Sequence, residues 1–348
     1  MIESKTVDLK KYGKPLLETM LHDMLQIRRF EEKAGQMYGL KKINGFCHLY
    51  NGQEAVAIGS IRALDLGRDY VLTGYRDHGH ALACGMDPKT IMAELYGKAT
   101  GSSRGKGGSM HLFDAKRHML GGNGIVGAQI PIATGLAFAS AYNFKLGKTP
   151  DMGVTLCYFG DGAIHQGAFH ESLNLAKLWQ LPVVYIVENN AFGMGTAVRR
   201  ASAVVDFDVK AKSYNIEGRI VDGMNVLEVY DAVRDVVADA RKTGDPYLLD
   251  IKTYRYRGHS MSDPAKYRSK EELEQFKLLD PITFLKDAMI AAKLLTEEAY
   301  AALDERLKQQ ALDAVEFAEQ SPEPGLETIY EDIMVENEEY ANAGHHLS

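Results

Sequence analysis

Two short turns in this sequence carry the residues best suited to bind a metal ion together with a phosphate. Gly160-Asp161-Gly162 directly follows the apolar run Val154–Phe159, and Asn189-Asn190 directly follows the apolar run Val183–Val187. Such runs are typical of buried strands, and ligands of parallel sheets bind beyond the carboxyl ends of the strands. A carboxylate and an amide carbonyl are oxygen ligands that suit Mg²⁺. The pair of turns therefore predicts a Mg²⁺–diphosphate site.

Two further clusters combine charged and aromatic side chains. Tyr75-Arg76-Asp77-His78-Gly79-His80 places an arginine, which donates bidentately to phosphates, between an aromatic ring and two imidazoles. The segment Arg255–Pro264 carries His259, which could bind phosphate or move protons near neutral pH. Each cluster alone is also compatible with an ordinary surface turn or loop, and Gly45-Phe46-Cys47-His48 is a weaker signal of the same kind.

The glycines of Gly122–Gly127 match the Gly-x-Gly-x-x-Gly pattern of nicotinamide-binding folds. That pattern requires a preceding strand, and residues 116–120 are not predicted to form one. No acidic residue follows at the end of a second strand either. We therefore reject nicotinamide binding and expect this turn to let backbone approach a flat cofactor.

The elements around these clusters alternate between helix and strand. Helices are predicted over Pro15–Leu40, Ala55–Leu64, Asp87–Gly97, Ala128–Leu146, Val226–Lys242 and from Ser269 onward. Further strands are predicted at Arg219–Val221 and Tyr247–Tyr256, and the 26 residues from 163 to 188 suit a helical crossover. This alternation predicts an α/β fold with a doubly wound parallel sheet. We expect one domain over residues 1–348, with helical extensions at 1–45 and 269–348.

The composition excludes several other classes of protein. The 348 residues carry a net charge of −7 without a basic run, which argues against nucleic-acid binding. No apolar stretch is long enough to span a bilayer, so no membrane contact is expected. Three widely spaced cysteines indicate reduced thiols, and the first residues resemble neither a signal nor a transit peptide. A bacterial cytoplasmic location is expected, with a processed organellar chain as the alternative.

Taken together, the motifs resemble the alpha subunits of the thiamine-diphosphate-dependent 2-oxoacid dehydrogenases, and most closely the pyruvate-specific members. The matching stretches are Gly45–Tyr50, Gly52–Ala55, Tyr75–Gly79, Gly105–His111, Gly121–Gln129, Gly160–Gly162, Glu188–Gly195 and Tyr254–Pro264. They follow the family's order across residues 21–330. The resemblance implies the thiamine-diphosphate-binding fold, with thiamine diphosphate and Mg²⁺ as cofactors.

The resemblance also implies a role for each site residue. Mg²⁺ would be held by Asp161, Asn190 and the backbone carbonyl of Phe192, where many relatives carry Tyr. The cofactor-binding residues would be Tyr75, Arg76, Gly124, Val126, Asp161, Gly162, Ala163, Asn190 and His259. The substrate-binding residues would be Phe46, His48 and Tyr75. The catalytic residues would be His48 and His259.

The implied reaction is oxidative decarboxylation of pyruvate with reductive acetylation of a lipoyl group. The implied partners are a beta subunit, which supplies the missing catalytic glutamate in an α₂β₂ heterotetramer, and the lipoyl domain of an acetyltransferase. The Gly121–Gln129 stretch and Asp161 favour pyruvate; acetoin and branched-chain 2-oxo acids are the alternative substrates, and a scaffold subunit without cofactor is the non-enzyme alternative. Ser260 matches a phosphorylated serine of mitochondrial relatives, but the loop lacks their second serine, so no kinase control is expected.

Overall fold

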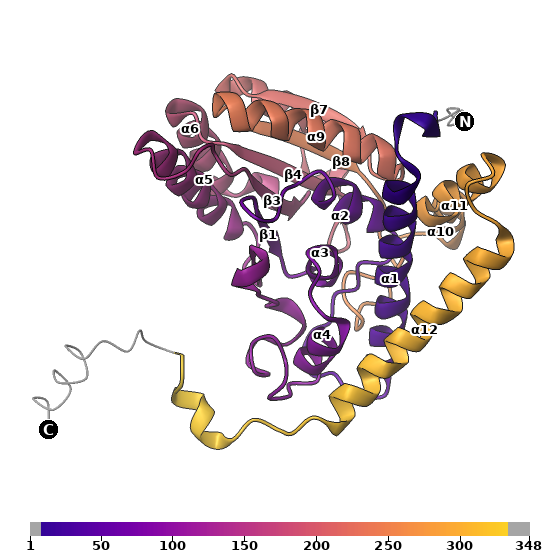
Figure 1. Ribbon diagram of the computed structural model, residues 1–348. Coiled ribbons are helices and arrows are strands. Elements are labelled where there is room, and N and C mark those ends of the chain that lie inside the picture. The colour runs from indigo at the N-terminus through magenta and orange to yellow at the C-terminus, as the bar shows by residue number, and fades with distance from the viewer. Residues whose placement is uncertain (1–7, 333–348) are drawn as a thin grey trace, which may run out of the picture.

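The computed structural model describes residues 8–332, and its centre is a six-stranded sheet (Figure 1). All strand pairs are parallel, in the order β2-β1-β3-β4-β8-β7. The strands are β1 Tyr70–Gly74, β2 Met119–Asn123, β3 Thr155–Gly160, β4 Val183–Asn189, β7 Glu217–Asp222 and β8 Tyr247–Lys252, and a separate antiparallel hairpin is formed by β5 Phe192–Gly193 and β6 Thr196–Ala197. Every residue of β4 is buried, as expected for an apolar strand covered on both faces.

Helices cover both faces of this sheet. They are α1 Lys14–Gly39, α2 Glu54–Ile61, α3 His78–Ala83, α4 Pro88–Leu95, α5 Gln129–Lys145, α6 Gly167–Trp179, α7 Val198–Ala201, α8 Asp208–Ala211, α9 Val226–Thr243, α10 Lys270–Lys277, α11 Pro281–Ala291 and α12 Glu297–Gln320. Short 3-10 helices are η1 Leu9–Lys11, η2 Gly108–Met110, η3 Ala115–Arg117, η4 Ala163–His165, η5 Lys212–Tyr214 and η6 Leu326–Tyr330. The predicted doubly wound α/β fold is therefore confirmed.

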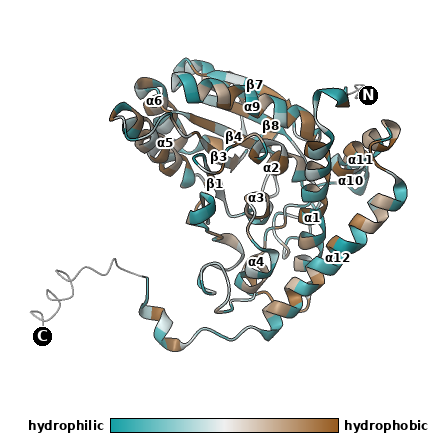
Figure 2. Ribbon diagram, in the orientation of Figure 1, coloured by the Kyte–Doolittle hydropathy of each residue, from teal (hydrophilic) through white to brown (hydrophobic). Residues whose placement is uncertain are grey.

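Two hydrophobic clusters, one on each face, hold these layers together. One cluster joins α5 and α6 to the strand residues Cys157, Tyr185 and Val187. The other joins α1, α2, α9 and α12 to the opposite side of the same strands, including Tyr158 and Ile186. The side chains of a strand point alternately to its two faces, which explains this division. The brown segments in Figure 2 mark the apolar residues from which both layers are built.

The predicted helical extensions are present at both ends of the described chain. Helix α12 runs along α1 and contacts both α1 and α4 (Figure 1). The apolar residues Leu17 and Leu21 of α1 and Leu307 and Ala314 of α12 are all buried in one cluster. The terminal ends of both predicted extensions lie outside the described residues.

One statement made from the sequence is partly wrong: of residues 116–120, which were not expected to form a strand, Met119 and Leu120 begin strand β2. Strand β2 pairs in parallel with β1, which was not predicted, through Val71↔Met119 and Thr73↔Gly122. Its Gly-rich sequence has low β propensity, but backbone pairing at the sheet edge holds it. The absence of a strand was therefore not a valid reason to reject nicotinamide binding. The next strand along the chain, β3, also ends directly before an acid, Asp161, although β3 pairs with β1 and not with β2.

Among residues 8–332, no helix is both long enough and apolar enough to cross a membrane.

Candidate functional site

The two predicted turns meet at a cavity beyond the carboxyl ends of β3 and β4. Its volume is about 290 Å³, and it extends along the end of β1 as well. The predicted site residues that line it are Tyr75, Arg76, Val126, Asp161, Gly162, Ala163, Asn190, Phe192 and His259. Three of the predicted residues, Phe46, His48 and Gly124, do not line it. The motifs are thus brought together although more than 180 positions of the sequence separate Tyr75 from His259.

The loops after β3 and β4 approach each other at two glycines. A Cβ atom added at Gly193 would lie 3.6 Å from Asp161 Oδ1 and 3.6 Å from the Cα atom of Gly162. Asp161 is 4% exposed, and its Oδ2 atom has no hydrogen-bond partner among the described residues. Burial raises the pKa of Asp161 to about 6, although the Arg255 charge opposes this. A buried carboxylate oxygen without a partner is costly and indicates a ligand that is positively charged.

The other two predicted metal ligands already face a positive charge. Nη1 of Arg255 lies 3.3 Å from Asn190 Oδ1 and 3.4 Å from the carbonyl oxygen of Phe192. Both oxygens therefore face the same cationic group, the guanidinium of Arg255. Together with Asp161 they form an all-oxygen set with a single carboxylate, which fits Mg²⁺ shared with phosphate oxygens. The described residues contain no cluster of three or more His, Cys, Asp or Glu side chains that would suit another kind of metal site.

Arg76 connects three segments at the rim of the cavity. It is 7% exposed, and its two terminal nitrogens donate to the carbonyl oxygens of Leu49 (2.6 Å) and His259 (2.7 Å). Burial, aided by the charge of Arg255, lowers its pKa to about 10, so it remains cationic at neutral pH. Arg76 thereby adds positive charge to the cavity and holds the loop of His259 in place.

Three rings form a cluster beside the cavity. The centroid of the His48 ring lies 4.4 Å from that of Tyr75 and 5.1 Å from that of His259. Burial lowers the pKa of His48 to about 2 and that of His259 to about 4, and the charge of Arg76 adds to both shifts. Both imidazoles are therefore neutral at pH 7, with one donor and one acceptor nitrogen each.

The remaining predicted residues lie one layer further out. His48 reaches the cavity only through the rings of Tyr75 and His259, and Phe46 lies 6.5 Å from the His48 ring and is 61% exposed. Gly124 lies against His111, since a Cβ atom added there would be 2.9 Å from its ring. Ser260 is 8% exposed, and its Oγ atom lies 2.9 Å from that of Ser262.

Several residues that line the cavity were given no role from the sequence, among them the polar residues Gln53, Glu188 and Arg255. Gln53 lies at the start of α2, Glu188 at the end of β4, and Arg255 just after β8. Glu188 accepts a short hydrogen bond from the Tyr50 hydroxyl and lies 3.3 Å from Nε2 of His80. The signal for Glu188 was available, because it is an acid directly before Asn189 at a strand end. Gln53 and Arg255 also lie in stretches that match the family, but their roles follow only from their contacts with Asn190.

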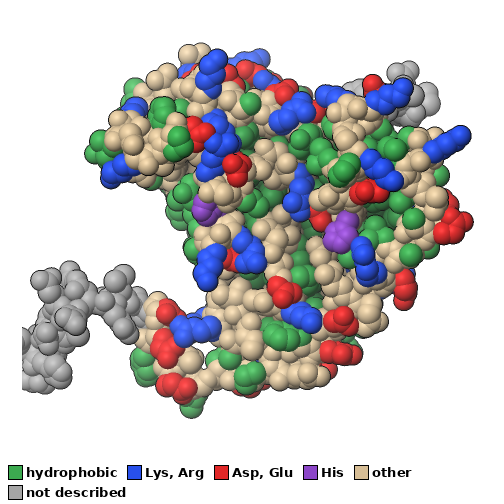
Figure 3. All heavy atoms as spheres, in the orientation of Figure 1, with side chains coloured by type: hydrophobic (Ala, Val, Ile, Leu, Met, Phe, Trp, Pro, Cys, Tyr) green, Lys and Arg blue, Asp and Glu red, His purple; other side chains and the backbone are tan. Residues whose placement is uncertain are grey.

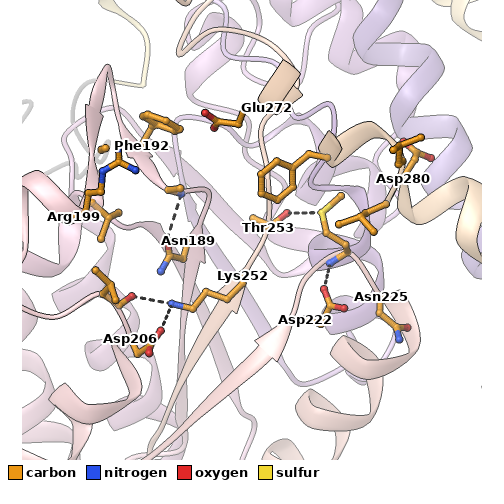
Figure 4. Close-up of a pocket in the computed structure, with 18 of the residues that line it drawn as sticks. Asn189, Phe192, Arg199, Asp206, Asp222, Asn225, Lys252, Thr253, Glu272 and Asp280 are labelled. Carbon is orange, nitrogen blue, oxygen red and sulfur yellow. Dashed lines mark hydrogen bonds and ion pairs between the residues drawn. The ribbon is translucent and has the colours of Figure 1, made fainter. Parts of the chain in front are cut away.

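A larger cavity of about 970 Å³ lies on the other side of the 189–198 segment (Figure 4). Its polar groups bond to one another: Lys252 Nζ contacts the carbonyl oxygen of Val205 (2.8 Å) and the carboxylate of Asp206 (3.0 Å). Among the described residues that line it, no buried side-chain nitrogen or oxygen lacks a partner. The smaller cavity has three such atoms, on Gln53, Gln129 and Asp161, and is therefore the better candidate for a polar ligand.

Comparison with known proteins gives one family. Residues 22–327 match the model of the family described as "Dehydrogenase E1 component". The chain is 50% identical over 333 residues to the pyruvate dehydrogenase E1 component subunit alpha of Rhizobium meliloti (strain 1021), covering 95% of this chain and 91% of that protein. It is 51% identical over 313 residues to the protein of the same name from Zymomonas mobilis, covering 90% of this chain and 86% of that protein. The corresponding protein of Porphyra purpurea is 42% identical over 322 residues, covering 92% and 93%.

Proposed function

The chain belongs to the dehydrogenase E1 component family, and we propose that it is the alpha subunit of a pyruvate dehydrogenase. In this proposal it takes part in the oxidative decarboxylation of pyruvate and the reductive acetylation of a lipoyl group. The substrate is supported by relatives that share about half of its residues and carry that name.

The observation that carries the proposal is the set of oxygens at the small cavity. Asp161 Oδ2 lacks a partner, and beside it Asn190 Oδ1 and the Phe192 carbonyl oxygen already face the cationic Arg255. We assign Mg²⁺ to these three ligands. The diphosphate of thiamine diphosphate is assigned to Tyr75, Arg76 and His259 and the backbone of Gly162 and Ala163, and its aminopyrimidine to Gly124 and Val126.

Thiamine diphosphate, when bound, supplies the electron sink for decarboxylation of a 2-oxo acid. The residues of the chain hold the cofactor, balance its charge and handle protons. Phe46, His48 and Tyr75 are assigned to the substrate side. Because His48 and His259 are neutral at pH 7, each ring can donate one hydrogen bond and accept another beside the substrate, and we assign a catalytic role to both.

A beta subunit is proposed to complete the site as part of an α₂β₂ heterotetramer. The cavity wall formed by Val126 continues into α5, which exposes Phe138 (45%) and Tyr142 (52%), stacked on each other, to solvent. Exposed large apolar side chains that adjoin one another mark protein interfaces. The lipoyl domain of an acetyltransferase is the proposed acceptor partner. The bacterial cytoplasm is the proposed location, supported by bacterial relatives and by three free, buried cysteines.

The proposal is tested by purifying the chain with its beta subunit and measuring reductive acylation of a lipoyl domain. Pyruvate should be used with a higher kcat/KM than 3-methyl-2-oxobutanoate or acetoin. A preference for either of the latter would reassign the substrate. Calorimetry of the pair with Mg²⁺ and thiamine diphosphate separates an enzyme from a scaffold, because a scaffold subunit would give no binding heat.

A further inference from the structure

We infer that Gln53 is a further cofactor-site residue: it orients the metal ligand Asn190 and donates a hydrogen bond to the diphosphate. The inference rests on the proposed function, which it deepens by adding a residue that none of the sequence motifs assigned to the site.

Arg255 fixes the orientation of the Asn190 amide. A guanidinium group can only donate hydrogen bonds, so the atom of Asn190 that faces Arg255 Nη1 at 3.3 Å must be the amide oxygen. The backbone N–H of Phe192, also a donor, lies 3.4 Å from the same oxygen. Two donors on one side leave a single arrangement of the amide, with its NH₂ group on the opposite side.

Gln53 receives that NH₂ group. Asn190 Nδ2 donates to Gln53 Oε1 at 2.9 Å, and both side chains are buried. Because the oxygen of Gln53 is used by Asn190, its own NH₂ group must point elsewhere. Nε2 of Gln53 has no partner among residues 8–332, although Gln53 is only 1% exposed. Arg255 therefore fixes the orientation of the Asn190 amide, and Asn190 in turn fixes that of the Gln53 amide. The NH₂ group of Gln53, which lines the cavity, is left as a donor without a partner.

The cavity therefore holds unsatisfied polar atoms of both kinds. Gln53 Nε2 is a donor, Asp161 Oδ2 and Gln129 Oε1 are acceptors, and all three atoms are buried. An anion alone would leave Asp161 without a partner, and a cation alone would leave Gln53 without one. A magnesium diphosphate offers phosphate oxygens to the donor and a metal ion to the carboxylate, so it satisfies both groups.

The backbone around Gln53 is held firmly. Gly52 has a φ of +97°, and a Cβ atom added there would lie 2.3 Å from the carbonyl oxygen of Tyr254. The Gly52 N–H donates to Glu54 Oε2 at 2.9 Å, and Glu54 accepts two hydrogen bonds from Arg28. These contacts fix the start of α2, so the Gln53 side chain is positioned before any ligand binds.

The test compares two substitutions in the complex of the chain with its beta subunit. Gln53→Met removes both hydrogen-bonding groups at nearly constant volume. Gln53→Glu keeps an acceptor for Asn190 but removes the donor and adds a negative charge. Gln26→Met is the matched control, because Gln26 Nε2 bonds Gln310 Oε1 at 2.9 Å far from the cavity. Mn²⁺ binding at saturating thiamine diphosphate is read by electron paramagnetic resonance, and thiamine diphosphate binding at saturating Mg²⁺ by calorimetry.

Gln53→Met should weaken the binding of both Mn²⁺ and thiamine diphosphate by about 10- to 100-fold, the effect of losing a hydrogen bond to a charged group. Gln53→Glu should weaken thiamine diphosphate binding by a similar factor but leave Mn²⁺ binding within about threefold. Gln26→Met should match the wild type.

Unchanged binding of both ligands by Gln53→Met, with an unchanged melting temperature, would overturn the inference. Unchanged thiamine diphosphate binding by Gln53→Glu would overturn the direct contact. Failure of the wild-type complex to bind would instead refute the proposed function.

Discussion

Among the described acids that line a cavity, Asp161 is the one with a buried oxygen that has no hydrogen-bond partner. Its burial raises its pKa to about 6, so the negative charge at neutral pH is held at a cost that a metal ion would offset. The buried charge of Asp161 therefore lowers the stability of the cofactor-free chain, whereas the same charge raises the affinity for the cofactor.

Asp161→Asn should change the affinity for the cofactor and the stability of the cofactor-free chain in opposite directions. In the complex with the beta subunit, we expect thiamine diphosphate affinity at saturating Mg²⁺ to fall by more than the roughly 10- to 100-fold that changes outside the ligand shell cause. The cofactor-free chain should melt at the same temperature or slightly higher, because a neutral amide replaces a buried charge. Calorimetry and thermal melting measure the two effects, and wild-type affinity in the variant would contradict the metal assignment.

Asp77 is a buried acid that does not line the cavity. It is 0% exposed, Oδ2 accepts from the Leu112 N–H at 2.9 Å, and Oδ1 has no partner among the described residues. Burial raises its pKa to about 7, above its value in an unfolded chain. Between about pH 4 and 7 the folded state therefore binds more protons than the unfolded state, and this residue's contribution to stability falls as the pH rises.

Asp77→Asn should remove that pH dependence. At pH 8 we expect the variant to be more stable than the wild type by about 1–3 kcal/mol, the usual cost of a buried unsatisfied polar group. At pH 5, where the wild-type acid is mostly protonated, the difference should nearly vanish. Urea unfolding at both pH values measures it, and an equal difference at pH 5 and pH 8 would show that the raised pKa does not control the effect.

Helix α4 organises the glycine-rich segment that follows it through a single carboxylate. Glu94 is 0% exposed and accepts hydrogen bonds from four backbone N–H groups, those of Ser103, Gly105, Gly107 and Gly108, at 2.7–3.0 Å. The same segment continues to His111, whose Nδ1 atom lies 3.0 Å from the carbonyl oxygen of Gly122. Glu94 thereby supports the turn at Gly124 that is assigned to the aminopyrimidine.

Glu94→Gln should destabilise this segment. An amide offers one acceptor oxygen in place of two, so about two N–H groups lose their partner, at about 1–3 kcal/mol each. We expect a lower free energy of unfolding and faster proteolysis between residues 101 and 109. Glu323→Gln is the control, because it removes only the surface ion pair with Lys98 and should cost less than about 1 kcal/mol. Equal effects of the two substitutions would refute this role of Glu94.

The elements also show what the sequence could and could not predict. Strands β3 and β4 were predicted because continuous apolar runs precede their turns. Strand β2 was not, because glycines at positions such as Gly122 lower β propensity while the fold requires them. A Cβ atom added at Gly122 would overlap the carboxylate of Asp77. In the site, the two turn motifs pointed to Asp161 and Asn190, whereas Gln53 is recognised only from its contact with Asn190, 137 positions away.

The terminal helices share one hydrophobic cluster with the sheet, which supports the single-domain organisation that we propose. Leu17 of α1 and Leu307 of α12 are buried in the same cluster as Tyr158 and Ile186 of the sheet. A chain with one such continuous core should unfold as a unit. Calorimetry of the isolated chain should give one transition, and a separate early transition lost on truncation of α12 would indicate an independent C-terminal unit.

The exposed face of α5 is the part of the molecule best suited to meet the beta subunit. Its inner face packs Ile130 and Ala137 in the core, yet its outer face stacks Phe138 on Tyr142 at 5.9 Å and places Phe138 5.7 Å from Trp179 of α6. In the view of Figure 3, hydrophobic side chains reach the surface over α5 and α6. This apolar face starts beside Val126 at the cavity, where the proposed beta subunit would lie if it supplies the catalytic glutamate that the resemblance implies.

Phe138→Glu should therefore prevent assembly without unfolding the chain. A charge buried in the interface without a partner costs about 3–5 kcal/mol, enough to lower the affinity for the beta subunit by more than 100-fold. Leu312→Glu is the matched control, because Leu312 is 40% exposed on α12, away from this face. Size-exclusion chromatography with light scattering of the co-expressed pair should show separate chains for Phe138→Glu and an α₂β₂ particle for Leu312→Glu. A wild-type particle formed by Phe138→Glu would place the beta subunit on another face.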